Sequence, residues 1–250
     1  MKNLFIGKYL VIALCLLSVQ SLIAKDIYLS VNGVDTNNGL SESGAVATLA
    51  KALSLIEDGD NIRVSGIIDV SKEVSGIEGV AIPQMAFSII GDSPSTSGFT
   101  GNGVTRIFNI DSNDKETQYK NLSFINGAQN QTKGSAVFIQ NSRSVFTNCI
   151  FKNNIAVSCK GTVYLYTPNQ VEFYDCIFTD NQVQQGGAVF SEMRGKLVMD
   201  RCMITNCNLQ SVANSNGGGL QILGIESFVL KNSTVRNCSV AQRGGGINIE

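Results

Sequence analysis

The sequence predicts an all-β fold, a right-handed parallel β-helix with three strands per rung and a short N-terminal capping helix. Composition is the first observation behind this prediction. The 250 residues include 25 glycines and only three prolines, 16% of them are charged, and histidine and tryptophan are absent. Frequent Gly, Asn, Val and Ile favour short strands joined by tight turns. The second observation is a short motif that returns along the chain at a nearly constant interval.

Five segments align on one template. They are NLSFING from Asn121, NCIFKNN from Asn148, DCIFTDN from Asp175, RCMITNC from Arg201 and NSTVRNC from Asn232. Their starting points are separated by 27, 27, 26 and 31 residues, and a glycine-led strand such as QGGAVFSE follows each one. With the strand that precedes each motif, every period holds three strands and three turns. This arithmetic is typical of one rung of a parallel β-helix, whose rungs stack about 4.8 Å apart.

Stacked rungs place equivalent residues above one another, so the repeat predicts inward-facing columns. The aligned positions are almost purely apolar, which a set of exposed loops would not produce. The first three columns are Phe124, Phe151, Phe178, Ile204 and Val235; Leu122, Cys149, Cys176, Cys202 and Ser233; and Tyr119, Phe146, Phe173, Met199 and Leu230. On the glycine-led strand we expect Val137, Tyr164, Val189, Leu220 and Ile247 to point inward, followed two residues on by Ile139, Tyr166, Ser191, Ile222 and Ile249.

Two further columns are expected to form corners of the coil, because Asn and Asp tolerate the left-handed backbone conformation better than other residues with a side chain. The first column is Asn121, Asn148, Asp175, Arg201 and Asn232, and the second is Asn126, Asn153, Asp180, Asn206 and Asn237.

Residues 1–24 have the layout of a secretory signal peptide. Two lysines lie ahead of the apolar run at residues 9–17, and cleavage is expected near Ala24. The alternative, a membrane-spanning anchor, needs about 20 apolar residues, whereas polar residues interrupt this run from Ser18 onward. We therefore expect a protein that is secreted or displayed at the outer membrane or cell surface.

Residues 25–102 are expected to form an N-terminal cap and the first irregular rungs, and residues 103–250 the regular rungs. Leu49, Ala52, Leu53 and Ile56 follow helical spacing, so a short helix could cover the open end of the coil. At the other end, no closing element follows the strand that begins at Gly244. The sequence is therefore expected to be truncated at its C-terminus, or to have its last rung covered by another chain. Expressed alone, it is expected to self-associate through the uncapped edge.

Six cysteines remain if Cys15 is removed with the signal peptide; they are Cys149, Cys159, Cys176, Cys202, Cys207 and Cys238. Those of the inward column have parallel side chains, whereas a disulfide needs converging Cβ atoms. We expect them to be buried thiols that fill space. Cys207 and Cys238 share a turn column and are the pair favoured for a disulfide. Because a metal site needs His or closely spaced Cys pairs, no metal or cofactor is predicted.

The repeat resembles a known family at the words FKNN from Phe151, FTDN from Phe178 and GGAV from Gly186. These words are similar to the F-x-x-N and G-G-A-[ILV] words of the chlamydial polymorphic outer membrane protein repeats. The surrounding rungs, with the segments from Asp26 and Ala47, resemble right-handed parallel β-helix proteins secreted by Bacteroidetes. The resemblance implies an exported β-helix and is specific for fold rather than for activity.

No catalytic group recurs with the motif, so we expect a non-enzymatic, adhesin-like or carbohydrate-contacting surface protein. The alternative is a polysaccharide lyase acting on an acidic glycan, which needs a Lys or Arg base and often carboxylates that bind Ca²⁺. Its candidate residues are Glu172, Asp175, Arg194, Lys196, Asp200 and Arg201, which solvated surface charge explains equally well. A hydrolase with a Gly-His-Gly word is excluded because histidine is absent.

A binding face is the competing site. Phe138, Leu165 and Phe190 are expected to form an outward apolar stripe across three rungs, and such stripes mark a partner or a covering loop. The alternative is that the strand register is inverted here and the stripe belongs to the core. The predicted partner is a glycan or a host or cell-surface protein. A net charge of −1 gives no field that would gather nucleic acid.

Overall fold

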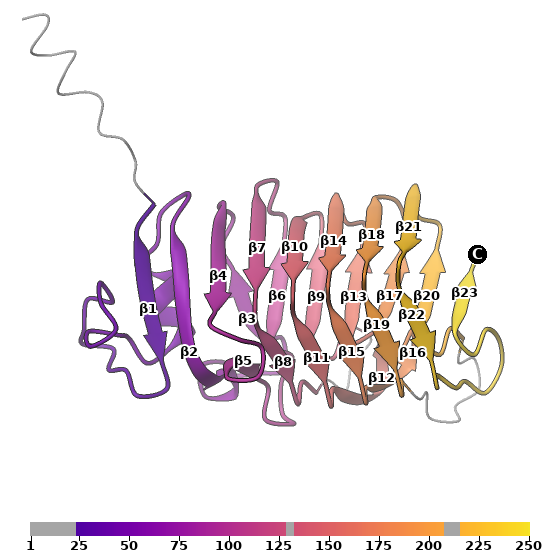
Figure 1. The fold of residues 1–250 in the computed structure, drawn as a ribbon, viewed down its shortest axis with the longest axis horizontal. Coiled ribbons are helices and arrows are strands. Elements are labelled where there is room, and N and C mark those ends of the chain that lie inside the picture. Colours follow the sequence, from indigo (N-terminus) through magenta and orange to yellow (C-terminus); the bar gives the residue numbers. More distant parts are fainter. Residues whose placement is uncertain (1–23, 129–132, 208–215) are drawn as a thin grey trace, which may run out of the picture.

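The computed structural model describes residues 24–128, 133–207 and 216–250, apart from the side chains of residues 156–159. The predicted signal peptide lies outside this part of the chain. Figure 1 shows short strands stacked in rows along the long axis of the molecule. The strand pairs are parallel, and successive pairs join equivalent residues of successive repeats. This arrangement confirms the predicted parallel β-helix.

Three sheets form the walls of the coil, and each rung passes through them in turn. The first sheet contains β1 (Asp26–Ser30), β2 (Asn61–Asp69), β4 (Phe87–Gly91), β7 (Glu116–Lys120), β10 (Arg143–Thr147), β14 (Gln170–Tyr174), β18 (Lys196–Asp200) and β21 (Ser227–Lys231). The second contains the end of β2, then β5 (Ser97–Thr100), β8 (Ser123–Ile125), β11 (Ile150–Lys152), β15 (Ile177–Thr179), β19 (Met203–Thr205) and β22 (Thr234–Arg236). The third contains β3 (Val80–Ile82), β6 (Phe108–Asp111), β9 (Val137–Gln140), β13 (Val163–Tyr166), β17 (Val189–Glu192), β20 (Leu220–Leu223) and β23 (Ile247–Ile249).

Two smaller features complete the coil. β12 (Ile155–Lys160) pairs with β16 (Gln182–Gln185) between the second and third walls. β2 serves two sheets, because residues 61–64 pair with β4 and residues 66–69 pair with β5. Gly66 makes the bend between them with φ +89°, a conformation that suits glycine.

The predicted inward columns form the core. Phe124, Phe151 and Phe178 stack face to face, with ring centroids 4.8 and 4.6 Å apart. A second aromatic column, Tyr119, Phe146 and Phe173, repeats at 4.6 and 5.0 Å. The two columns meet edge to face, as aromatic rings prefer. The rung spacing therefore sets the spacing of the core side chains.

The two predicted corner columns adopt the left-handed conformation throughout. Their φ values lie between 51° and 56° at all ten positions, Arg201 included. Side-chain hydrogen bonds run between rungs at these corners, as where Asn148 Nδ2 donates to Asn121 Oδ1 at 2.9 Å. The amide column is thus a repeated turn that also ties neighbouring rungs together.

A buried amide ladder lies next to the second corner column. Asn154 and Asn181 are fully buried. Each side chain donates from Nδ2 to a carbonyl of the preceding rung, Phe124 O for Asn154 and Phe151 O for Asn181, both at 3.0 Å. The Asn181 Oδ1 accepts from the backbone N–H of Asn154, also at 3.0 Å. Asn154 lies between two strands, so the amide of the next rung supplies the acceptor that its buried backbone N–H requires.

The cysteine predictions had mixed outcomes. Cys149, Cys176 and Cys202 are buried free thiols, as expected, and Cys159 lies among the side chains that are not described. The predicted disulfide is wrong for this structure, because Cys207 and Cys238 are also free. They occupy the same column as the buried amides, and successive residues in that column have parallel side chains, which is poor geometry for a bridge.

The N-terminal end is covered by the helix α2 (Leu49–Leu53) and the segments around it. Leu49, Ala52 and Ile56 are buried against the core, and Leu53 packs beside them, as predicted. The carboxylate of Glu73, just after the 3₁₀ turn η1 (Val70–Lys72), accepts from the backbone N–H of Leu49 and Ala50 at 2.9 and 2.8 Å. In the described part of the chain, no helix has the length and apolar character to span a membrane.

Candidate binding site

The predicted apolar stripe contains one error of register. Tyr164, not Leu165, pairs with Phe138 and Phe190. The outward column is therefore Phe138, Tyr164 and Phe190, whereas Val163 and Leu165 face the core. The glycine-led strand of this rung starts one residue earlier than its neighbours, directly after an irregularity in the β12–β16 pairing. A one-residue shift exchanges the two faces of a strand, so both predicted inward positions, Tyr164 and Tyr166, lie outside the coil.

The corrected stripe is outward but not exposed. Phe138, Tyr164 and Phe190 are only 3%, 6% and 0% exposed and form a small hydrophobic cluster of their own. Cations lie over two of its rings. Lys133 Nζ is 4.8 Å from the centroid of Phe138, and Lys160 Nζ is 4.8 Å from that of Phe190. A partner could not reach this covered cluster without displacing what lies over it.

Polar groups close the edge of the same cluster. The Tyr164 hydroxyl donates to Glu192 Oε2 at 2.7 Å, and Lys160 Nζ lies 3.2 Å from that oxygen. Burial, together with the Glu192 carboxylate, raises the pKa of Tyr164 well above its usual value. Tyr164 therefore stays protonated at neutral pH. Lys160 is engaged by the same carboxylate.

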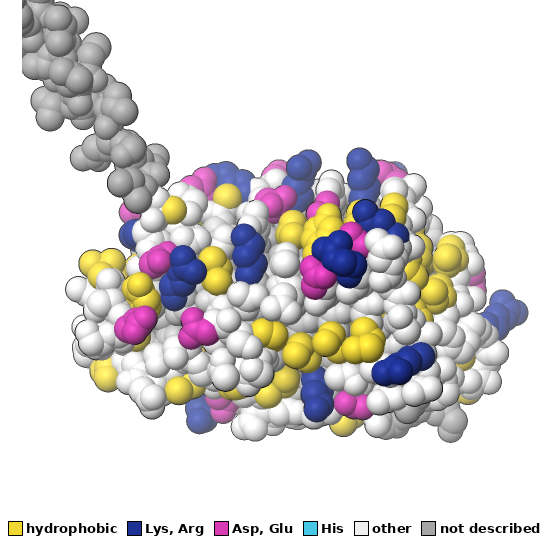
Figure 2. Space-filling view, in the orientation of Figure 1, with side chains coloured by type: hydrophobic (Ala, Val, Ile, Leu, Met, Phe, Trp, Pro, Cys, Tyr) yellow, Lys and Arg dark blue, Asp and Glu magenta, His cyan; other side chains and the backbone are white. Residues whose placement is uncertain are grey.

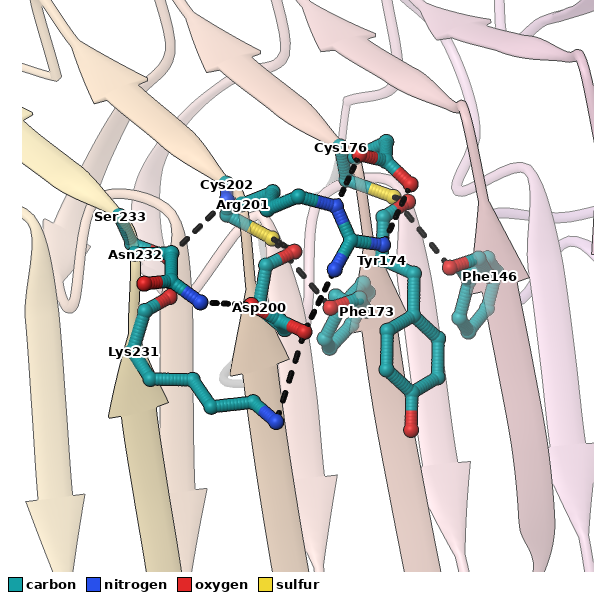
Figure 3. Close-up of polar contacts among 11 residues, drawn as sticks. Phe146, Phe173, Tyr174, Cys176, Asp200, Arg201, Cys202, Lys231, Asn232 and Ser233 are labelled. Carbon is teal, nitrogen blue, oxygen red and sulfur yellow. Dashed lines mark hydrogen bonds and ion pairs between the residues drawn. The ribbon is translucent and has the colours of Figure 1, made fainter.

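Half of the candidate lyase residues form a charged corner between the first and second sheets (Figure 3). Arg201 Nε and Nη2 contact the Asp175 carboxylate at 2.7 and 2.9 Å, and Nη1 contacts Asp200 Oδ2 at 2.7 Å. Asp200 also accepts from Asn232 Nδ2 at 2.9 Å and lies 3.5 Å from Lys231 Nζ. The Arg201 bond lowers the pKa of Asp175, and the Asn232 bond is the main cause that lowers the pKa of Asp200.

The charged corner is thus a saturated ion network rather than an acid–base pair. Glu172 is also engaged, because the Tyr174 hydroxyl donates to it at 2.7 Å. Arg194 and Lys196 lie elsewhere, at the opposite end of β18 from Asp200. The structure does not bring the six predicted residues together.

A different hollow lies where the third sheet turns into the first, at the end that includes Arg194. It has a volume of about 710 Å³, and we call it the corner hollow. Its lining comes from four successive rungs, and the residues are Asn141, Arg143, Tyr166, Thr167, Pro168, Asn169, Met193, Arg194, Gly195 and Glu226. Figure 2 shows Lys and Arg side chains standing along the upper rim of the molecule, where the loops between these sheets run.

The backbone of the corner hollow is unusually constrained. Thr167, Met193 and Arg194 have φ values of 46°, 63° and 57°, although none of them is Gly, Asn or Asp. A β-branched residue with positive φ is uncommon, and such outliers concentrate at functional sites. Gly195 continues the left-handed run at φ +82°, and a Cβ placed there would lie 1.7 Å from Pro168 O. Arg194, in this turn, is exposed.

The charges of the corner hollow are unpaired, unlike those of the charged corner. Across residues 24–128, 133–207 and 216–250, the guanidinium groups of Arg143 and Arg194 make no ion pair, and neither does the carboxylate of Glu226. Tyr166 belongs to the same lining and is half-buried, and its ring lies 6.2 Å from that of Tyr164. Thr167 Oγ1 donates to Asn141 Oδ1 at 2.8 Å, which fixes one amide of the wall.

Sequence reasoning singled out Arg194 but missed Arg143 and Tyr166 as site residues. The turns between the third and first sheets lack a repeated Asn position, so the sequence did not predict a site there. The signal that could have found it is the presence of Thr167 and Met193 at turn positions where other rungs have Asn or Gly.

A second hollow, of about 360 Å³, lies at the N-terminal end and includes Tyr28, Glu42 and Asp92. Its arginine, Arg63, is paired with Asp26 at 3.0 Å, so this hollow offers no free cation. Among the residues whose structure is described, no cluster of three or more His, Cys, Asp or Glu side chains could hold a metal ion.

Comparison with solved structures gives a similarity to a rhamnogalacturonan lyase, with a TM-score of 0.39 and 12% sequence identity. The match covers 82% of this chain and 62% of that chain, so this chain spans less than two thirds of the enzyme's length. A likeness this distant does not bear on activity. No curated protein matches the sequence.

The family comparison is informative about the fold. The model for the right-handed β-helix region matches residues 106–250, which is more than half of the chain. The matched segment begins at the end of the irregular rungs and includes all five copies of the motif. With the parallel three-walled coil described above, this match shows that the chain belongs to the right-handed β-helix family.

Proposed function

We propose that this protein is an exported, non-enzymatic surface protein that binds an acidic glycan in the corner hollow. The observation that carries the proposal is that two arginines, Arg143 and Arg194, line one hollow with the ring of Tyr166 and make no ion pair within the described part of the chain. Arginine pairs with carboxylate or sulfate groups in bidentate geometry. An aromatic ring offers a flat apolar surface to a sugar ring, and Asn141 and Asn169 offer amides for hydroxyl groups.

Glu226 adds one carboxylate to a lining that otherwise carries two arginines. It lies in the same lining as the two arginines but makes no ion pair with either. A single carboxylate among unpaired cations disfavours a second acidic group at its own position and accepts hydrogen bonds from hydroxyl groups. The ligand that fits is therefore a glycan with acidic groups alternating with neutral sugars, rather than a densely charged polyanion.

Polysaccharide lyase activity on an acidic glycan is the second candidate. It is favoured by the position of Lys160 and Tyr164, whose cluster adjoins Tyr166 of the corner hollow. Two observations argue against the lyase. Glu192 engages both Lys160 and Tyr164, and Tyr164 is only 6% exposed. We therefore favour binding of the glycan without cleavage.

The test is calorimetric titration of residues 25–250 with oligosaccharides of alternating uronic acid and neutral sugar, and with neutral oligosaccharides of equal length. We expect heat only with the acidic series. Arg143→Gln and Arg194→Gln should each weaken binding about tenfold, since one charge-assisted bond is lost. Arg236→Gln is the matched control, because Arg236 is an exposed arginine on the second wall, away from the hollow.

Equal binding of the acidic and neutral series, or equal loss of affinity in Arg236→Gln, would contradict the proposal. The same samples can be followed by ultraviolet absorbance. Release of unsaturated sugar ends, abolished in Lys160→Ala but kept in Arg236→Gln, would establish the lyase instead.

A further inference from the structure

We propose that Cys207 and Cys238 form a redox-active dithiol, in which Cys238 is the attacking thiol and Cys207 the resolving thiol toward a small-molecule disulfide. The claim differs from a permanent structural disulfide, because both thiols are free in this structure. It is also independent of glycan binding, since neither residue lines the corner hollow.

The two thiols are neighbours in adjacent rungs. β19 and β22 pair in register up to Thr205 and Arg236, so the residues two positions further on, Cys207 and Cys238, lie one above the other. Each thiol donates to the carbonyl two residues before it, at 3.5 Å for Cys207 and 3.3 Å for Cys238.

Exposure assigns the two roles. Cys207 is fully buried, whereas Cys238, at the equivalent position after β22, is partly exposed. A dissolved disulfide can therefore reach Cys238 but not Cys207. A bridge requires one sulfur to move, because stacked Cβ vectors are nearly parallel, and Cys238 is the less enclosed of the two.

The electrostatics of the pair support the same assignment. The neighbouring Cys207 thiol lowers the pKa of Cys238 to about 7. The pKa of Cys207 is raised by the same interaction and by burial. A thiolate is the nucleophile in disulfide exchange, so the exposed sulfur is also the reactive one at neutral pH.

The inner column supplies an internal comparison. Cys176 and Cys202 also stack in adjacent rungs, but both are buried, and the pKa of each is raised, by burial foremost for Cys176 and by the neighbouring thiol for Cys202. Stacking of cysteines alone is therefore not sufficient for reactivity. The difference at Cys238 is its exposure.

The exchange proceeds in two steps with glutathione disulfide as the oxidant. The Cys238 thiolate attacks one sulfur of glutathione disulfide, which forms a mixed disulfide and releases one glutathione thiolate. The Cys207 sulfur then attacks Cys238 Sγ, the mixed disulfide breaks, and the second glutathione leaves with the proton from Cys207. The two protein thiols are oxidised to one disulfide, and the glutathione disulfide is reduced to two thiols.

The experiment has two parts, both read by peptide mass spectrometry on residues 25–250. Alkylation at neutral pH should label Cys238 roughly tenfold faster than an ordinary exposed thiol, because about half of it is thiolate. Cys149, Cys176 and Cys202 should stay unlabelled until the protein is unfolded. Treatment with glutathione disulfide should then yield a Cys207–Cys238 peptide pair within one molecule.

Variants separate the roles. Cys207→Asn should accumulate the mixed disulfide at Cys238, since no resolving thiol remains, and Asn is suited to this column because Asn154 and Asn181 occupy it. Cys207→Ser serves the same purpose if the larger side chain disturbs folding. Cys238→Ser should not react, and Cys176→Ser should behave as the parent protein.

Three results would overturn the assignment. They are a Cys238 label no faster than that of Cys176, a mixed disulfide that persists in the parent protein, and a bridge between two molecules through Cys238. Circular dichroism of each variant shows whether the fold is intact, so a failure to react can be read as chemistry.

Discussion

The rings of Phe151 and Phe178 stack with centroids 4.6 Å apart and an angle of 5° between their planes. They come from equivalent positions of consecutive rungs, and backbone pairing holds them in register. Because the ladder fixes the spacing, truncating one ring leaves a gap that its neighbours cannot close by moving along the column. The backbone pairing of the strands thus also sets the packing distances between the core side chains.

Phe151→Ala should lower the free energy of unfolding by about 3–5 kcal/mol, the usual cost of a large cavity in a core. Urea unfolding followed by circular dichroism measures this loss. Lys152→Ala, on the exposed side of the same strand, should change it by less than about 0.5 kcal/mol. Similar losses in the two variants would show that the stack is not a principal stabilising element.

Asn181→Ala should be nearly as damaging, although it removes few atoms. The change removes the Asn181 Oδ1 acceptor of two buried donors, the backbone N–H and the side-chain Nδ2 of Asn154. We expect a loss of about 2–4 kcal/mol, since each buried unpaired group costs about 1–3 kcal/mol. Thermal unfolding compared with Gln182→Ala, the partly exposed neighbour, tests the prediction. A stability loss below that of the Gln182 variant would contradict it.

The Asp175–Arg201 pair should make a small, pH-dependent contribution. Asp175 has a pKa lowered by Arg201 from its ordinary value of 3.8. A carboxylate with a lowered pKa stabilises the fold above its unfolded pKa and loses that contribution as pH falls through the folded pKa. Both side chains are about half exposed, so the gain at neutral pH should be at most about 1 kcal/mol.

Asp175→Asn is the matched variant for this test, because Asn occupies the same left-handed corner at Asn121 and Asn148. The Tm difference between parent and variant should be constant from neutral pH down to about pH 5 and shrink below about pH 4. A difference that grows toward acid pH would contradict the assigned sign.

Gly195→Ala should disrupt the corner hollow. The new Cβ would lie 1.7 Å from Pro168 O, in addition to the ordinary cost of a left-handed alanine. Gly224→Ala is the matched control, since Gly224 has φ +57° but nothing within 4 Å of the added Cβ. Glycan titration and thermal unfolding should show loss of both affinity and stability in the first variant. In the second variant, we expect only about 1 kcal/mol of destabilisation. Equal effects would mean that the contact with Pro168 is unimportant.

The sequence by itself determined the coil. Its fixed period predicts which residues stack, as the pairing of Phe124, Phe151 and Phe178 confirms. Asn at regular corners predicts left-handed turns, which all ten corner positions adopt. These features are local, and they recur in every rung. Each repeat therefore predicts the same geometry independently, and a wrong alignment of one repeat does not change the prediction for the others.

Tertiary structure decided which side chains of β13 face the core and which residues line the corner hollow. A single residue fewer in the turn before Val163 exchanged the inward and outward positions of Tyr164 and Leu165, and no local preference reveals such a shift. The pairing state of the arginines depends on side chains from different rungs. Arg201 meets Asp175 in the rung before it, whereas Arg143 and Arg194 line one hollow without meeting a carboxylate. Charge alone is visible in the sequence, but whether a charge is satisfied depends on distances that only the folded coil sets.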